Sequence, residues 1–297
     1  MRVRKNVGTK FNPKRFTRDQ IKFYIIIVPI AIFMALPIVY LFVSAFKPLD
    51  ELLEFPPKFF VRNPTFQNFI DLFQRSGTTG LPIYRYLINS IIVTLGVTFL
   101  SVLFSSMAGY ILSKKQFKMK KALFEINTLS MMFVSCAVII PRFLIISNIG
   151  IINTLWAHVL PLLAIPVGLF LVKQFIDEVP NDLIEAAKLD GAGDFYIYTK
   201  IILPLIKPAL VTVAILAFQT AWNNTETSNL YVNQEEYQTF AYYLSTLTNA
   251  SNSISGAGVS AAAALIIFLP NLIIFIFLQS KVMDTMSHSG IIPQLLQ

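Results

Sequence analysis

Long runs of apolar residues, separated by short polar or basic segments, dominate the chain. A helix that crosses a bilayer needs about 20 mostly apolar residues, and it satisfies its own backbone hydrogen bonds. The pattern predicts six membrane-spanning helices, at residues 23–46, 86–112, 122–141, 152–175, 209–231 and 258–279. The fifth run becomes polar after Trp222. The predicted fold class is therefore all-α, an integral membrane helical bundle.

The composition agrees with a chain that lies in lipid. Hydrophobic residues make up 55% of the 297 residues and charged residues only 13%, whereas soluble domains are about 25% charged. The run at 23–46 is longer than the apolar region of a cleaved signal peptide, and no small-x-small cleavage site follows it. We therefore expect this run to be an uncleaved membrane helix. The sequence thus predicts a multi-pass protein of the cell membrane.

Positive charge gathers in particular loops. Of the 24 Lys and Arg residues, eight lie in residues 1–22 and five in residues 113–121. Lys and Arg collect in short cytoplasmic loops of membrane proteins. With the N-terminus inside, the cytoplasmic segments hold 18 of these residues and the external segments six. Both termini are therefore predicted to be cytoplasmic, and the net charge of +8 needs no nucleic-acid partner, since no aromatic and basic platform accompanies it.

The spans divide the chain into a few regions. The prediction is a cytoplasmic basic tail at 1–22, a first span at 23–46, an external loop with an amphipathic helix at 47–82, a transmembrane core at 83–280 and a cytoplasmic tail at 281–297. Within the core, residues 177–208 form a cytoplasmic loop. Residues 223–256 form an external loop that is polar, acidic and long for a simple connector.

The cytoplasmic loop is predicted to begin with a short helix over residues 182–189. Asn181 or Asp182 can cap the start of this helix, because a short polar side chain accepts hydrogen bonds from the first free backbone N–H groups. Ala186 and Ala187 then lie on one small, flat face of the helix. Such a face permits close approach by another protein.

A second short helix is predicted over residues 195–202. Gly191 permits the sharp turn that ends the first helix, Asp194 can cap the second, and Pro204 is expected to break it. The loop is therefore predicted to be a rigid helix-turn-helix that offers a docking surface to a cytoplasmic partner.

This stretch resembles the EAA loop of permease subunits from bacterial ATP-binding-cassette (ABC) importers. The family pattern is Glu-Ala-Ala, three residues, Gly, nine residues, Ile, one residue, Leu-Pro, and every position is matched. The matched residues and the two that flank the glycine are Glu185, Ala186, Ala187, Asp190, Gly191, Ala192, Ile201, Leu203 and Pro204. The tripeptide Asp-Gly-Ala at 190–192 resembles the sequence at this position in the carbohydrate branch of the family, particularly in maltose-type sugar permeases of the second-permease kind. The likeness extends over nearly the whole chain.

The resemblance implies a function and a set of partners. The loop would be a coupling helix that sits in a cleft of an ATPase subunit and links ATP-driven closure to movement of the membrane helices. The implied partners are two ABC ATPase subunits, a second homologous permease, an extracellular sugar-binding protein that the 223–256 loop contacts, a carbohydrate substrate and membrane lipid. The chain lacks a phosphate-binding Gly-x-x-x-x-Gly-Lys-Ser/Thr loop. ATP and Mg are thus expected on the partner ATPases, with no cofactor and no enzymatic activity on this chain.

Polar side chains inside the predicted spans are candidates for a sugar path, because a neutral, hydroxyl-rich solute needs amides, hydroxyls and aromatic faces. The main candidates are Asn89, Gln219, Trp222, Asn223 and Asn271. Further candidates are Ser90, Thr94, Asn127, Ser130 and Ser135, although a bond to the helix's own carbonyls is the commoner role of Ser and Thr. Trp222 either stacks on a sugar ring or lies in the interfacial aromatic belt.

A stripe of small residues runs along the second predicted span. Ser101, Ser105 and Gly109 recur every four residues, and the sixth span begins with a run of Gly, Ala and Ser. Small residues on one stripe let helix backbones approach closely. The stripe serves either packing within one bundle or packing across a moving subunit interface.

Three other functions remain as alternatives. A secondary transporter usually has ionisable groups at mid-membrane, and the predicted helix interiors lack acids. A membrane enzyme would need a catalytic pattern, and no Ser-His pair or His-Glu-x-x-His is present. An ABC permease for another solute class is the nearest alternative. No metal site is expected, since the two histidines are far apart and Cys136 is the single cysteine.

Overall fold

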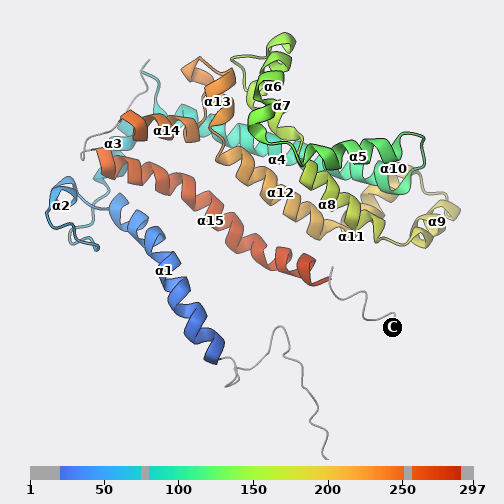
Figure 1. The fold of residues 1–297 in the computed structure, drawn as a ribbon, viewed down its shortest axis with the longest axis horizontal. Coiled ribbons are helices and arrows are strands. Elements are labelled where there is room, and N and C mark those ends of the chain that lie inside the picture. The colour runs from blue at the N-terminus through green and yellow to red at the C-terminus, as the bar shows by residue number, and fades with distance from the viewer. Residues whose placement is uncertain (1–20, 75–79, 251–255, 289–297) are drawn as a thin grey trace, which may run out of the picture.

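The computed structural model of the protein describes residues 21–74, 80–250 and 256–288, and every element in these ranges is helical (Figure 1). The basic tail predicted at 1–22 lies almost entirely outside the described residues, as does the end of the tail predicted at 281–297. The elements are α1 Ile21–Ala45, α2 Leu49–Leu53, α3 Gln67–Gln74, α4 Ile83–Lys114, α5 Lys120–Ser130, α6 Ser135–Ile149, α7 Trp156–Leu163, α8 Pro166–Asp177, α9 Asn181–Leu189, α10 Asp194–Tyr196, the π-helix η2 Ile197–Ile202, α11 Leu203–Leu205, α12 Lys207–Trp222, α13 Glu226–Tyr231, the 3-10 helix η3 Glu235–Tyr237, α14 Phe240–Ala250 and α15 Ala257–His288.

Three helices of the described chain are long and apolar enough to cross a membrane alone, namely α1, α4 and α15. Two further candidates are bent pairs. One joins α7 and α8 at 47°, and the other joins the segment Asp194–Leu205 to α12 at 81°. The first bend falls directly before Pro166 and the second directly before the Lys207-Pro208 step. A residue before proline is pushed out of the helical region, and Ile165 before Pro166 is indeed extended, with φ −110° and ψ 91°. The second bend lies at Ile206, which leaves the helical region with ψ 11°.

The single helix predicted at 122–141 is wrong, because α5 ends at Ser130 and α6 begins at Ser135. Polar side chains bind backbone groups at this break. The Ser130 hydroxyl donates to the Asn127 carbonyl at 2.6 Å, and the Asn127 amide donates to the Pro166 carbonyl at 3.1 Å. Such bonds offer the backbone an alternative to the helix ladder. The run predicted at 209–231 is likewise divided, since α12 ends at Trp222.

Helix α4 lies at the centre of the bundle, in contact with α12, α8 and α7 (Figure 1). The small-residue stripe faces these neighbours within the same chain. Ser101 is fully buried and donates to the Leu163 carbonyl at 3.2 Å, which satisfies a backbone group near the bend after α7. At Gly109 the backbones are so close that an added Cβ would lie 2.9 Å from Cγ1 of Val172 in α8. The stripe therefore serves packing inside this bundle.

The end of α1, the start of α4, the start of α15 and helix α3 form a second packed cluster. Asn68 of α3 donates its amide to the carbonyls of Ala45 and Lys47, at 2.9 and 2.7 Å. Gly258 of α15 packs directly on the Asn68 side chain, since a Cβ there would lie 2.5 Å from Oδ1. In contrast, α1 diverges from the bundle over most of its length, and its apolar side chains are exposed up to Tyr40 (Figure 1).

The close contact at Gly109 yields a test of the packing. We expect Gly109→Ala to destabilise the protein by about 1 kcal/mol net, because overpacking costs about 1–3 kcal/mol and the helix propensity of alanine offsets up to about 1. Val172 is β-branched and fully buried, so it has little room to move. The measurement is thermal unfolding of the detergent-solubilised chain.

Gly96→Ala is the matched control in the same helix, because its Cβ would meet only Val159 Cγ2, at 3.9 Å. This variant should be neutral or slightly stabilised. Equal thermal stability of the two variants would contradict the assigned close packing of α4 on α8.

Candidate functional site

The loop predicted at residues 177–208 begins with α9, which is held on the end of α4. Ile184 is buried beneath the helix. The Lys114 ammonium at the end of α4 donates to the Val179 carbonyl at 2.6 Å and to Asn181 Oδ1 at 3.0 Å. Both capping residues predicted for this helix are wrong, because Pro180 occupies the cap position and no side chain caps the helix. Lys114 instead binds the oxygen that Asn181 would have used.

The C-terminal end of α9 has a complete Schellman motif. Gly191 lies in the left-handed region with φ +82°, its N–H donates to the Lys188 carbonyl at 3.0 Å, and the Ala192 N–H donates to the Ala187 carbonyl at 2.9 Å. These two bonds satisfy carbonyls that the end of a helix leaves free. The sharp turn expected at Gly191 is thus built from the backbone, and it sets the angle at which the next helix leaves.

The second half of the loop is one continuous helical segment made of α10, η2 and α11. Asp194 lies inside the first turn, with Gly193 at the cap position, so the predicted Asp194 cap is wrong. Its carboxylate instead pairs with the Lys115 ammonium at 2.5 Å. The break predicted at Pro204 is also wrong, since helix continues to Leu205. The wide turns of η2 directly before Pro204 leave room for a proline ring that a regular helix would exclude.

The π-helix returns the loop to the bundle core. Ile197 and Ile202 are fully buried. The Tyr198 hydroxyl and the Ser106 hydroxyl of α4 share a hydrogen bond of 2.7 Å, and the Tyr198 ring lies 5.6 Å from that of Tyr110. Both halves of the loop are therefore fastened to the same helix, α4.

Between the two halves lies a hollow of about 550 Å³. Its walls include three matched residues of the Glu-Ala-Ala pattern and the two residues that flank its glycine. The lining residues are Ala187, Asp190, Gly191, Ala192, Gly193, Tyr196, Lys200 and Ile201. Glu185 and Ala186 are exposed on α9 beside it, whereas Leu203 is half-buried on the core side and Pro204 is exposed. The structure thus brings most of the predicted residues to one concave surface.

Sequence reasoning missed three features of this surface. Leu189 is 89% exposed at the end of α9, and Tyr196 and Lys200 line the hollow. These residues lie in three different elements, α9, α10 and η2, and the angle between these elements decides which side chains line the hollow. In the sequence, Lys114 and Lys115 are recognisable only as positive charges. Their role in holding the loop depends on contacts with residues distant in sequence.

The candidates for a sugar path separate into two groups. Asn89 is buried, and its amide donates to the carbonyls of Glu236 and Gln238 at 2.8 and 2.9 Å. Trp222 is also buried, with its indole N–H bonded to the Ile267 carbonyl at 3.0 Å and its ring stacked on Phe218. These two side chains hold helices and loops together in this structure, and neither presents an open face.

Asn223 and Asn271 form the second group. They lie on α12's cap and on α15, and the Asn271 amide donates to Asn223 Oδ1 at 3.0 Å. The Asn223 amide donates to the Gln219 carbonyl at 2.9 Å, while the Gln219 side chain is half-buried. This amide pair is accessible and can exchange its mutual bond for bonds to a hydroxylated solute.

A second hollow, of about 410 Å³, lies between α4, α5 and the bend before α8. Asn127, Ser130 and Ser105 contribute its polar groups, and apolar residues form the rest of its lining. Asn127 and Ser130 already bond to backbone carbonyls. The hollow therefore coincides with the helix break and has few free polar groups.

The segment after α13, which contains η3, is fixed firmly to the bundle. Besides the Asn89 bonds, Arg85 of α4 pairs with Glu236 at 3.1 Å. The buried His158 of α7 bonds through Nε2 to the Tyr237 carbonyl at 2.9 Å and through Nδ1 to the Thr227 hydroxyl at 2.7 Å. A carbonyl requires a donor, so Nε2 carries hydrogen. The segment is a positioned surface and not a free strand.

Comparison with known proteins agrees with this arrangement. Residues 101–280 match the family of binding-protein-dependent transport system inner membrane components. The chain is 28% identical to the arabinooligosaccharides transport system permease protein AraQ of Halalkalibacterium halodurans, over 88% of this chain and 92% of that protein. It is 29% identical to the trehalose transport system permease protein SugB of Mycobacterium tuberculosis, over 86% and 92%. A bacterial ABC transporter involved in import of the acidic polysaccharide alginate has the same fold, with TM-score 0.76 at 21% identity over 91% of this chain and 99% of that one.

The chain therefore belongs to the family of inner-membrane permease components of binding-protein-dependent transport systems. It is a multi-pass membrane protein and a transport subunit, not an enzyme. The resemblance inferred from the Glu-Ala-Ala loop is confirmed.

The Schellman turn yields a second test. We expect Gly191→Ala to loosen the end of α9, because a left-handed alanine costs about 1–2 kcal/mol even though no atom lies within 4 Å of its Cβ. Hydrogen exchange at the Gly191 and Ala192 amides should be faster than in the unmodified chain.

Gly193→Ala is the control, since Gly193 has φ −73° and equally open surroundings. It should leave exchange at the turn unchanged. Faster exchange in both variants would show that loss of glycine flexibility, and not the left-handed turn, accounts for the effect.

Proposed function

We propose that this chain is one permease subunit of an ABC importer that carries a sugar or oligosaccharide across the cell membrane. The observation that supports the proposal is the concave surface between α9 and α10, because Ala187, Gly191 and Ile201 of the Glu-Ala-Ala pattern line it and a cytoplasmic ATPase subunit could dock there. The substrate class follows from relatives named for arabinooligosaccharides, trehalose and galactooligosaccharides. Two ATPase subunits, which carry ATP and Mg, would supply the energy.

The loop is built to transmit movement to the bundle. Lys114 and Lys115 hold its first and second halves, respectively, on the end of α4, and Tyr198 bonds to Ser106 in the middle of the same helix. Because α12 continues from α11 after a single bend, a displacement of the loop acts on α4 and α12 together. These two helices make extensive contact with each other. This connection is the physical basis for coupling ATPase closure to opening of a path.

We assign the remaining span to the pair α5 and α6, which gives six crossings with both termini in the cytoplasm. The support is the distribution of Lys and Arg, 18 in the cytoplasmic segments and six in the external ones. The family resemblance favours a second, related permease chain as the other half of the path. A solute-binding protein outside the cell completes the system.

The binding protein would contact the external segment that contains η3. Asn89, Arg85 and His158 hold this segment in a fixed position, and a preorganised surface loses little conformational freedom on docking. The related alginate transporter has been solved in complex with a periplasmic protein bound to an alginate pentasaccharide, with TM-score 0.56 to this chain. Part of the predicted 223–256 loop, residues 251–255, lies outside the described residues.

The docking role can be tested at Glu185. We expect Glu185→Ala to reduce both ATPase retention during purification and sugar uptake by about tenfold or more, because a hydrogen bond to a charged group contributes about 1.5–3 kcal/mol. Co-purification quantified by mass spectrometry and uptake of radiolabelled oligosaccharide are the two measurements.

Glu178→Ala is the matched control, since Glu178 is an exposed acid of the same cytoplasmic loop outside the Glu-Ala-Ala pattern. It should retain the ATPase. A Glu185→Ala variant with normal ATPase retention and uptake would count against this surface as the coupling site, and recovery of the chain alone with ATP-independent uptake would reject the importer.

The amide pair offers a test of the path. We expect Asn271→Leu to lower the rate of sugar uptake while ATPase retention and thermal stability stay unchanged, because the variant removes hydrogen-bonding capacity from an accessible site. Phe275→Leu, one turn further along α15 at an exposed apolar position, is the control and should transport normally. Normal uptake by Asn271→Leu would remove the pair from the path.

A further inference from the structure

The loop that follows α1 has an unusual distribution of charged and apolar side chains. It runs from Lys47 to Thr65, and we call it the clasped loop. The Thr65 N–H donates to the Phe46 carbonyl at 2.9 Å, and the Asn68 amide bonds to the carbonyls of Ala45 and Lys47. The two ends of the loop are therefore tied together at the end of α1.

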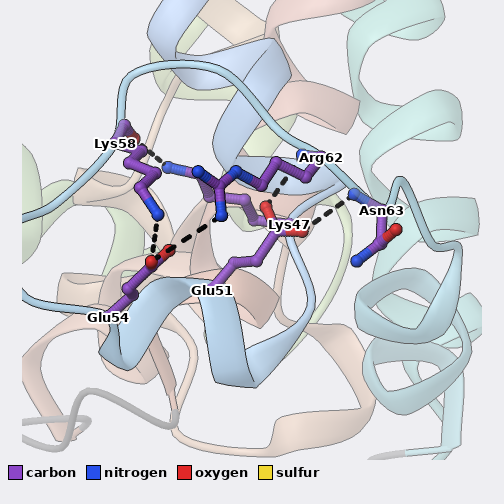
Figure 2. Close-up of polar contacts among 6 residues, drawn as sticks. All are labelled: Lys47, Glu51, Glu54, Lys58, Arg62 and Asn63. Carbon is purple, nitrogen blue, oxygen red and sulfur yellow. Dashed lines mark hydrogen bonds and ion pairs between the residues drawn. The ribbon is translucent and has the colours of Figure 1, made fainter.

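Charged groups are paired within the clasped loop (Figure 2). The Glu51 carboxylate accepts the backbone N–H groups of Arg62 and Asn63, at 3.0 and 2.8 Å. Lys58 pairs with Glu54, and the Lys47 ammonium, which is only 3% exposed, donates to the Lys58 carbonyl. The hydrogen bond from the Arg62 N–H lowers the pKa of Glu51, and the bond from Lys58 lowers that of Glu54. Both acids are thus ionised at neutral pH and hold the loop closed.

The large apolar side chains of the same loop point away from it. Phe55 is 92% exposed, Phe60 71% and Leu53 54%. In water the opposite distribution would be favourable, with aromatic side chains buried and charges solvated. Of the six charged side chains of the loop, Lys47, Glu51, Glu54 and Lys58 are buried or half-buried and bonded within the loop, while Asp50 and Arg62 are exposed. A loop with exposed phenylalanines and a few exposed charges is suited to the boundary between water and the membrane interior.

The position of the loop identifies that medium. Phe59 folds back against α1 and lies 5.9 Å, between ring centroids, from Tyr40. Tyr40 lies inside the apolar span Phe23–Ala45, five residues before its end, which corresponds to about 7.5 Å of helix. The clasped loop therefore reaches below the level at which α1 ends, beside a helix whose apolar side chains are exposed along most of its length.

We infer that the clasped loop is an interfacial membrane anchor whose Leu53, Phe55 and Phe60 insert into phospholipid at the boundary between headgroups and acyl chains. Apolar and aromatic side chains that enter this boundary give membrane attachment without a further span. The surface is continuous with the exposed apolar side of α1. The inference requires only that α1 crosses the membrane, so a failure of the transport or coupling tests would leave it standing.

The test measures which medium surrounds the loop. Cys136→Ser removes the single cysteine, and Phe55→Cys then carries an environment-sensitive fluorophore in the full chain, purified with its partners into vesicles of phosphatidylethanolamine and phosphatidylglycerol. We expect blue-shifted emission, quenching by nitroxide-labelled lipid and protection from aqueous iodide. Asn63→Cys is the control on an exposed polar side chain of the same loop and should show the reverse.

Two outcomes would overturn the inference. Quenching at position 55 by iodide and not by nitroxide lipid would show that the loop is in water. Protection from both quenchers would show that a protein partner covers it. If the Phe55→Cys protein does not assemble in the vesicles, Phe60→Cys provides the same measurements.

Discussion

The close approach of α8 and α12 to α4 is the contact on which the rest of the structure depends. In a bilayer, apolar surface gains little from leaving lipid for another helix, so association relies on tight packing and on satisfied polar groups. Gly109 provides the tight packing, since its backbone lies directly against the Val172 side chain. Ser101 satisfies a polar group, because its hydroxyl donates to the Leu163 carbonyl near the α7–α8 bend. A stripe of small residues thus permits bent spans to pack against one straight helix.

The loop that we propose for coupling, residues 177–208, extends this arrangement beyond the end of α4. Its hollow owes its shape to two turns of opposite character, the tight left-handed turn at Gly191 and the wide π-helical turns of η2. Both flanking segments are attached to α4, by Lys114 at its end and by Ser106 further in. A partner that fills the hollow would therefore push on the central helix of the bundle and not on a flexible connector. Rigid attachment of a docking surface to a moving element is what mechanical coupling requires.

The sequence predicts the parts of this structure that depend on local pattern. Apolar length locates α1, α4 and α15, and the glycine in the Glu-Ala-Ala spacing marks the left-handed turn. Features that depend on distant contacts are not predicted. Asn181 is a good cap by residue type, but Lys114 binds its oxygen. Asn89 and Trp222 are residue types that often bind solutes, yet both bond to the backbone of other segments. Asn223, in contrast, is exposed and bonds to the half-buried Asn271.

One rule connects the spans with the clasped loop. Any segment at membrane depth must satisfy its polar groups internally before it can present apolar atoms to lipid. The helices do this through their backbone ladders, and the break after Ser130 does it through Asn127 and Ser130. Outside the short helix α2, the clasped loop has no regular secondary structure, so charged side chains satisfy its backbone groups. Glu51 accepts two backbone N–H groups, and Lys47 donates to a backbone carbonyl. The phenylalanines Phe55 and Phe60 are exposed on the outside of this internally bonded loop.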